Sequence, residues 1–278
     1  PGETILLDKE KILSFVTAKG SLNSHTAILA KSMNIPAVVN VSDEFLSAIK
    51  NGDFAIADGF SGKFILNPDE ETISYYEKKR DEYKEKNDLL LSLKGKENKT
   101  IDGRRIDVFA NIGNAESIEK VKENDADGIG LFFFFFIFLG RDDFPSEEEQ
   151  FSVYKKVAES MSDKKVIIRT LDIGADKQAD YFGITEEENP ALGLRGIRLC
   201  LSRKDVFKTQ LRALYRASAF GNISIMFPMI ISEKEVDEIL SLCKDVREEL
   251  KKEGTPFDEK TELGIMIETP AAAIISDD

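Results

Sequence analysis

The chain has 278 residues, of which 42% are hydrophobic and 32% charged, as in a soluble globular protein with one or two domains. Its formal net charge of −13 argues against a surface for nucleic acid or anionic membrane. The longest apolar run, residues 131–139, is far shorter than the roughly 20 residues that span a bilayer, and we expect no membrane insertion. Cys200 and Cys243 lack metal-type spacing, which favours reduced core thiols and a cytoplasmic location.

Residues 1–68 alternate short apolar runs with glycine and Asn-Gly turns, which predicts a small mixed α/β domain. One helix is expected to start near His25 and to stop at the Asn34-Ile35-Pro36 segment. Residues 69–97 are rich in both acidic and basic side chains, interleaved with tyrosines. That composition indicates a long, mostly solvated helix, and its position between two differently patterned regions predicts a linker between domains.

Residues 98–278 alternate short β-like runs with amphipathic stretches. Repeated β-then-α order predicts a parallel sheet, either open or closed. We count five predicted strands: 106–112, 128–132, 166–171, 223–229 and 263–268. Several end in polar residues, among them Asn111, Arg169, Asp172 and Glu268. The carboxyl ends of the strands are where chemistry occurs in a (β/α)8 barrel, of which five strands would be a truncated form.

His25 is the only histidine, and it stands between Ser24 and Thr26 at the predicted start of a helix. A helix N-terminus offers free N–H groups and a partial positive charge, which suit a phosphoryl group carried on an imidazole. The alternative is a capping serine beside an incidental surface histidine. The local pattern alone leaves both interpretations open.

Several motifs resemble one known family. Residues 20–31, GSLNSHTAILAK, followed by IPAV at 35–38, are similar to the phosphohistidine signature of the PEP-utilising enzymes. Four further segments resemble the barrel of the Enzyme I family, the PEP–protein phosphotransferases of bacterial sugar phosphotransferase systems. They are RTLDIGADK at 169–177, NPALGLRGIR at 189–198, FPM at 227–229 and GIMIETPAAA at 264–273. The motifs occur in the family's order over nearly the whole chain.

This resemblance implies a fold and a site. It predicts a swivelling phosphohistidine domain at 1–68, a linker helix at 69–97 and a partial PEP-binding (β/α)8 barrel at 98–278. His25 would accept the phosphoryl group of phosphoenolpyruvate (PEP), and Arg169 matches a PEP-binding arginine. Glu268 matches a ligand of Mg²⁺, the implied cofactor, while Lys177 and Arg195 are further candidate PEP contacts. Without the family, Arg169 could equally form a strand-end salt bridge, and Glu268 could be a helix-entry charge before Pro270.

The resemblance also implies partners. The phosphoryl group would pass on to the phosphocarrier protein HPr, and the full-length protein is expected to be a homodimer. Because the chain begins at Pro1 and lacks the family's HPr-docking domain and last three strands, we expect an internal fragment that does not autophosphorylate by itself. The sugar served by the pathway is not encoded in these motifs.

One segment departs from the family pattern. The strand after Leu131 normally continues with an aromatic residue, Arg, Ser or Thr, and Glu, but here residues 132–136 are all phenylalanine. Phe133 therefore replaces a phosphate-binding arginine and Phe135 a glutamate. A reading error in a T-rich stretch and a degenerate gene copy both explain the run. The alternatives to an Enzyme I are a non-catalytic remnant of that enzyme, or a pyruvate phosphate dikinase or PEP synthase relative.

Overall fold

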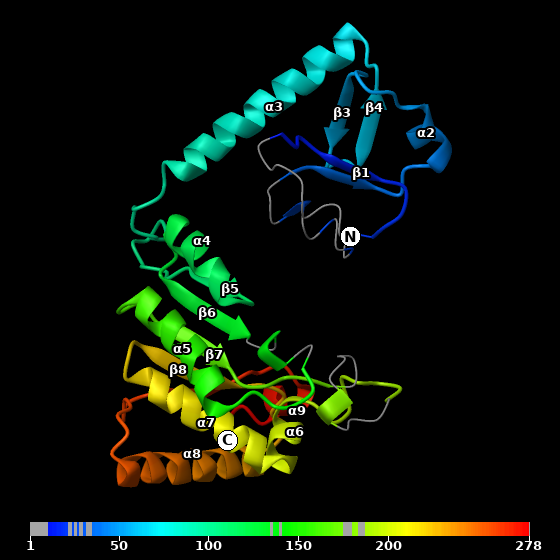
Figure 1. The fold of residues 1–278 in the computed structure, drawn as a ribbon. Helices are drawn as coiled ribbons and strands as arrows, with labels where there is room; N and C mark the ends of the chain where they lie inside the picture. The colour runs from blue at the N-terminus through cyan, green and yellow to red at the C-terminus, as the bar shows by residue number, and fades with distance from the viewer. Residues whose placement is uncertain are drawn as a thin grey trace. The chain divides into compact units, whose positions relative to one another are not determined.

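The computed structural model describes residues 11–21, 24, 27, 30–31, 35–133, 136–138, 141–174, 180–182 and 187–277. The chain forms two compact units, residues 1–93 and residues 94–278 (Figure 1). In this described part, no helix is long and apolar enough to cross a membrane.

The small unit is built from two pairs of short strands. Its first pair is parallel and its second is an antiparallel hairpin that turns at Gly62, where φ is +67°. The described elements are β1 (Phe15–Thr17), β2 (Ala37–Val39), α2 (Asp43–Ala48), β3 (Ala55–Asp58), β4 (Lys63–Leu66) and α3 (Glu70–Leu91). Of the helix predicted near His25, residues 27, 30 and 31 are helical, and the remainder lies outside the described residues.

The long helix α3 has no buried residue, as its charged sequence predicted. Asp69 precedes it as the N-cap, and its side chain accepts a hydrogen bond from the N–H of Thr72. Two contacts attach it to the β3–β4 hairpin. Lys79 Nζ lies 2.6 Å from Asp58 Oδ2, and the rings of Tyr83 and Phe60 lie 5.3 Å apart.

In the contact between Lys79 and Asp58, the Asp58 carboxylate is the buried partner. Burial by itself would raise the pKa of Asp58, but hydrogen bonds from Lys79, from the Ser61 hydroxyl and from the N–H groups of Phe60 and Ser61 together lower it to about 2. A carboxyl whose folded pKa is depressed stabilises the fold above its unfolded pKa, and this contribution is lost as the pH falls towards the folded value.

The larger unit is an α/β domain. Within its described residues one sheet contains five parallel strands in the order β5-β6-β7-β8-β9 (Figure 1). The strands are β5 (Phe109–Ile112), β6 (Gly128–Phe133), β7 (Val166–Arg169), β8 (Ile223–Phe227) and β9 (Glu262–Ile265). The helices are η2 (Ala115–Ser117), α4 (Ile118–Glu123), η3 (Phe136–Phe138), α5 (Glu147–Met161), η4 (Asp180–Phe182), α6 (Gly196–Ser202), α7 (Lys204–Ser218), α8 (Glu233–Glu253) and α9 (Pro270–Ile274).

This architecture confirms the predicted fold class. Neighbouring strands are consecutive in sequence and joined by helices, an arrangement consistent with part of a (β/α)8 barrel. Consecutive parallel strands bring all their carboxyl ends to one edge of the sheet. Residues that follow the strands are therefore gathered at that edge, although they are far apart in the sequence.

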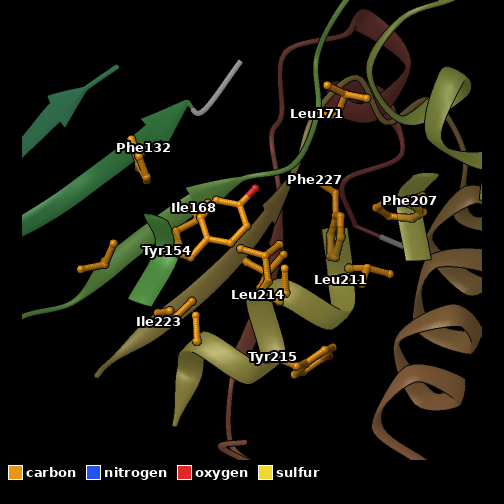
Figure 2. Packing of buried hydrophobic residues seen from close by; sticks show 14 of the residues in the cluster. Phe132, Tyr154, Ile168, Leu171, Phe207, Leu211, Leu214, Tyr215, Ile223 and Phe227 are labelled. Carbon is orange, nitrogen blue, oxygen red and sulfur yellow. The ribbon is translucent and has the colours of Figure 1, made fainter. Parts of the chain in front are cut away.

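Helices α5 and α7 pack on one face of the sheet and form the core with it. Figure 2 shows Tyr154 of α5 and Leu211 and Leu214 of α7 beside strand residues Ile168 and Phe227. All five side chains are almost completely buried. Helix α5 lies between β6 and β7, and helix α8 follows β8. Each begins with a capping box, at Ser146 for α5 and at Ser232 for α8. The core therefore fixes where each strand ends relative to its neighbours.

The attachment of α3 yields a prediction about stability. Replacement of Asp58 by Asn should lower the free energy of unfolding of the small unit by about 1 kcal/mol at neutral pH, because it removes one partner of a charge-assisted hydrogen bond. The difference from the unchanged protein should shrink as the pH falls from about 4 towards 2, where Asp58 itself becomes protonated. Urea unfolding and hydrogen exchange of the α3 amides measure both effects.

Asp81→Asn is the matched control, since Asp81 contacts Arg80 with both side chains exposed. Equal losses of protection in the two variants would contradict the role given to Asp58.

Candidate functional site

Two arginines share one buried carboxylate at the carboxyl end of β7. Arg169 is the last residue of that strand, Asp172 follows in the adjoining loop, and Arg195 immediately precedes α6. Asp172 Oδ2 lies 3.4 Å from an Nη atom of Arg169, while Arg195 contacts Oδ1 through Nε at 3.1 Å and Oδ2 through an Nη atom at 3.3 Å. Asp172 is 8% exposed. We call these three residues the arginine cluster.

The arginine cluster has a net positive charge. Its two guanidinium groups and one carboxylate sum to one formal positive charge for these three residues. Among the described residues, nothing accepts a hydrogen bond from the buried Nε of Arg169. Buried donors are normally paired, and an unpaired one beside excess positive charge suits an anionic ligand oxygen. The cluster can therefore bind an anion.

Phe133 lies beside Arg169. It is the last residue of β6, it pairs in register with Arg169 of β7, and its ring centroid is 5.8 Å from the Arg169 guanidinium carbon. The aromatic face attracts the cation but offers no hydrogen bond to an anion. Phe135, the other position that departs from the family pattern, lies outside the described residues.

Glu268 occupies the loop that follows β9. Its Oε1 accepts a hydrogen bond from the N–H of Met229, in the loop after β8, at 2.7 Å. Gly196 brings this region close to the arginine cluster, because a Cβ atom at Gly196 would lie 2.8 Å from Met229 Cγ and 3.2 Å from Asp172 Oδ1. The backbone of Gly196 also has φ +54°, which favours glycine. Close approach of these loops thus requires a residue without a side chain.

The described residues contain no group of three or more His, Cys, Asp or Glu side chains that could hold a metal ion. Glu268 is exposed and, within the described part of the chain, only its Oε1 is engaged. It could supply one hard oxygen ligand, and Mg²⁺ commonly combines one or two protein carboxylates with water and substrate phosphate oxygens. The donor type therefore fits Mg²⁺, provided that a ligand completes the coordination.

Two of the predicted site residues, His25 and Lys177, lie outside the described residues. Next to His25, the hydroxyl of Ser24 accepts a hydrogen bond from the N–H of Ala27 at 3.4 Å. That bond, between a residue and the third one after it, is the N-cap contact expected of Ser24. Gly20 has φ +143°, and a Cβ atom added there would lie 3.2 Å from Ser24 Oγ.

The structure brings Arg169 and Arg195 together, and Gly196 links them to the loop that Glu268 contacts. The sequence marks Asp172 as a polar residue at a strand end, and no motif assigns it to the site. Its spacing of three from Arg169 was the available signal. The link through Gly196 and Met229 had no sequence signal, because it joins loops that follow different strands.

Two known family descriptions together match most of the chain. The family description "PEP-utilising enzyme, PEP-binding domain" matches residues 88–278, and "PEP-utilising enzyme, mobile domain" matches residues 1–62. The chain belongs to the PEP-utilising enzymes. The predicted family is confirmed.

Similar proteins narrow the comparison within the PEP-utilising enzymes. The chain is 44% identical over 277 residues to the phosphoenolpyruvate-protein phosphotransferase of Buchnera aphidicola subsp. Acyrthosiphon pisum, and 43% identical to those of Staphylococcus aureus and Staphylococcus carnosus. Each match covers 100% of this chain and 48% of the relative. The chain thus spans about half the length of these curated relatives.

The candidate residues divide between the two matched regions of the PEP-utilising enzyme. His25 lies within the mobile-domain match, whereas Arg169, Lys177, Arg195 and Glu268 lie within the PEP-binding-domain match.

Cys200 of α6 is buried close to the arginine cluster. Its burial, together with the negative charge of Asp172, raises the pKa of its thiol. Cys200 therefore stays protonated and belongs to the core.

The close approach at Gly196 can be tested by substitution. Gly196→Ala should lower the free energy of unfolding of the larger unit by about 2 to 3 kcal/mol, because it adds a steric clash with Met229 to the strain of a positive φ. Gly254→Ala provides the matched control, since Gly254 has φ +70° and no atom within 4 Å of its added Cβ. Urea unfolding of both variants separates the two costs. Equal losses would show that packing around Gly196 contributes nothing.

Proposed function

We propose that this chain carries the phosphohistidine and PEP-binding parts of a phosphoenolpyruvate-protein phosphotransferase. In this function, the phosphoryl group of PEP passes to His25 and from there to HPr. The observation that carries the proposal is the identity of 43 to 44% over the whole chain to proteins of that name. The arginine cluster supports it independently, because PEP is a small, highly charged anion.

The domain roles follow from this proposal. Residues 1–68 would form the swivelling phosphohistidine domain, residues 69–97 the linker helix and residues 98–278 the PEP-binding partial barrel. The location would be the cytoplasm, and the full-length protein would be a homodimer.

The proposed chemistry is phosphoryl transfer in line. A ring nitrogen of His25 forms a bond to the phosphorus of PEP, and the bond between that phosphorus and the enol oxygen breaks. The enolate that leaves is protonated to pyruvate, and the imidazole loses its own proton. Such transfers depend on positioning and on cations that stabilise negative charge on the transferring group.

The chain supplies these cations. Arg169 and Arg195 would bind the phosphate and carboxylate oxygens of PEP, with Lys177 as a further contact. Asp172 contacts both guanidinium groups and reduces the repulsion between them. When Mg²⁺ is bound, it neutralises charge on the substrate oxygens, and Glu268 would hold it on the protein side.

Phe133 stands where this chemistry needs another cation. The strand register pairs position 133 with Arg169, so an arginine at position 133 would lie directly beside Arg169. Two adjacent guanidinium groups would repel each other in the empty site and would both be neutralised by a phosphoryl group. Phe133 should therefore lower the rate of transfer without preventing the fold, because its ring already packs at the end of the strand.

A chimera tests the function. The matching half of the Staphylococcus aureus relative is replaced by this chain, and label is followed from radioactive PEP to protein. The chimera should carry acid-labile phosphate, as expected of phosphohistidine, and His25→Ala should abolish it. Phe133→Arg in the chimera should raise the rate of labelling on the order of a thousandfold, the value of one cation at a phosphoryl transition state.

Phe133→Leu is the control, since it removes the ring without adding charge. Label that persists in the His25→Ala chimera would overturn the assignment of His25. Equal rates for the Arg and Leu variants would overturn the role of position 133.

A further inference from the structure

A chain of hydrogen bonds crosses the apolar core of the larger unit. It runs from the N–H of Leu171 to Gln210 Oε1 at 2.9 Å, from Gln210 Nε2 to the Tyr154 hydroxyl at 3.0 Å, and from that hydroxyl to Gln150 Oε1 at 3.4 Å. Gln150 Nε2 in turn donates to the carbonyl of Pro145 at 3.0 Å. In Figure 2 the Tyr154 hydroxyl points toward the end of the core that carries Leu171.

Every side chain in this hydrogen-bonded chain is buried. Gln210 is 2% exposed, and both Gln150 and Tyr154 are fully buried. Gln210 belongs to α7, whose neighbouring positions Phe207, Leu211 and Leu214 are core residues. Burying a carboxamide among apolar side chains is costly unless its hydrogen bonds are satisfied, and an apolar residue of the same length would avoid the cost. Packing of the apolar core therefore does not by itself account for a polar side chain at position 210.

Leu171 supplies that reason. The sheet ladder at this point ends with the bond from the N–H of Thr170 to the carbonyl of Met226, so Leu171 lies one residue beyond it. Gln210 takes the N–H of Leu171, and the Cys200 thiol of α6 donates to its carbonyl at 3.7 Å. Both peptide groups of Leu171 are thus held by helices after the strand has stopped pairing.

The residue held in this way directly precedes Asp172. The direction of the chain at Leu171 sets where the Asp172 carboxylate lies, and that carboxylate holds Arg169 and Arg195. Cys200 adds a second constraint, because it belongs to α6, the helix that Arg195 immediately precedes.

We infer that Gln210 is a positioning residue for the anion site: it fixes Leu171 so that Asp172 holds the two arginines in the geometry that binds PEP. This inference rests on the proposed function. Gln210 acts only through the backbone and does not itself touch the ligand.

The test uses the chimera described under the proposed function, in its His25→Ala form so that PEP is bound but not consumed, with arginine side chains labelled by ¹⁵N. In Gln210→Met, which keeps length but loses both hydrogen bonds, the Nε–H resonances of Arg169 and Arg195 should shift and broaden before any ligand is added. Titration with PEP should then show at least a tenfold weaker affinity than in the chimera with Gln210 intact. Gln210→Glu keeps an acceptor for Leu171 and should recover most of that affinity.

Ser218→Ala is the matched control. Ser218 is buried on the same helix and accepts a hydrogen bond from the N–H of Asp258, away from Leu171. Ser218→Ala should lower stability but leave the arginine resonances unchanged and the PEP affinity within twofold.

The outcomes separate two failures. If the chimera with Gln210 intact does not bind PEP, the proposed function fails and the inference about PEP geometry fails with it. If that chimera binds PEP but Gln210→Met leaves the affinity and both resonances as they were, the inference alone is overturned. Equal effects of Gln210→Met and Ser218→Ala would also overturn it, since they would reflect general destabilisation.

Discussion

The carboxylate of Asp172 is the interaction around which the site of the larger unit is organised. Two guanidinium groups within a few ångströms repel each other strongly in a partly buried environment. A buried carboxylate that contacts both of them reduces this repulsion. The carboxylate in turn needs its partners, because a buried charge without them would be costly. Arg169, Asp172 and Arg195 therefore depend on one another.

The sheet and helices supply the precision that this arrangement requires. Arg169 is placed by its position at the end of β7, Asp172 by the loop held at Leu171, and Arg195 by the start of α6. Gly196 allows the loops after β7 and β8 to meet. Three elements thus converge at one edge, and each is anchored in the same apolar core.

In the small unit, the long helix is held by other interactions than an apolar core. Helix α3 has no buried residue and is attached through Asp58 and a ring contact rather than through an apolar face. A helix with so little buried surface derives its stability from its cap, its charged pairs and that attachment. This explains how a long helix can remain largely solvated, as a linker between domains would be.

The sequence by itself determined the fold class and the family. Strand-like runs alternating with amphipathic stretches predicted the parallel sheet, because hydrophobic periodicity reports directly on local structure. Motifs in order indicated the PEP-utilising enzymes, and Arg169, Arg195 and Glu268 were proposed from them. Only the tertiary structure decided that Asp172 joins the two arginines, that Phe133 lies against Arg169 and that Gln210 holds Leu171. These contacts join residues on different strands and helices, and local patterns carry no information about which distant side chains a shared sheet edge will bring together.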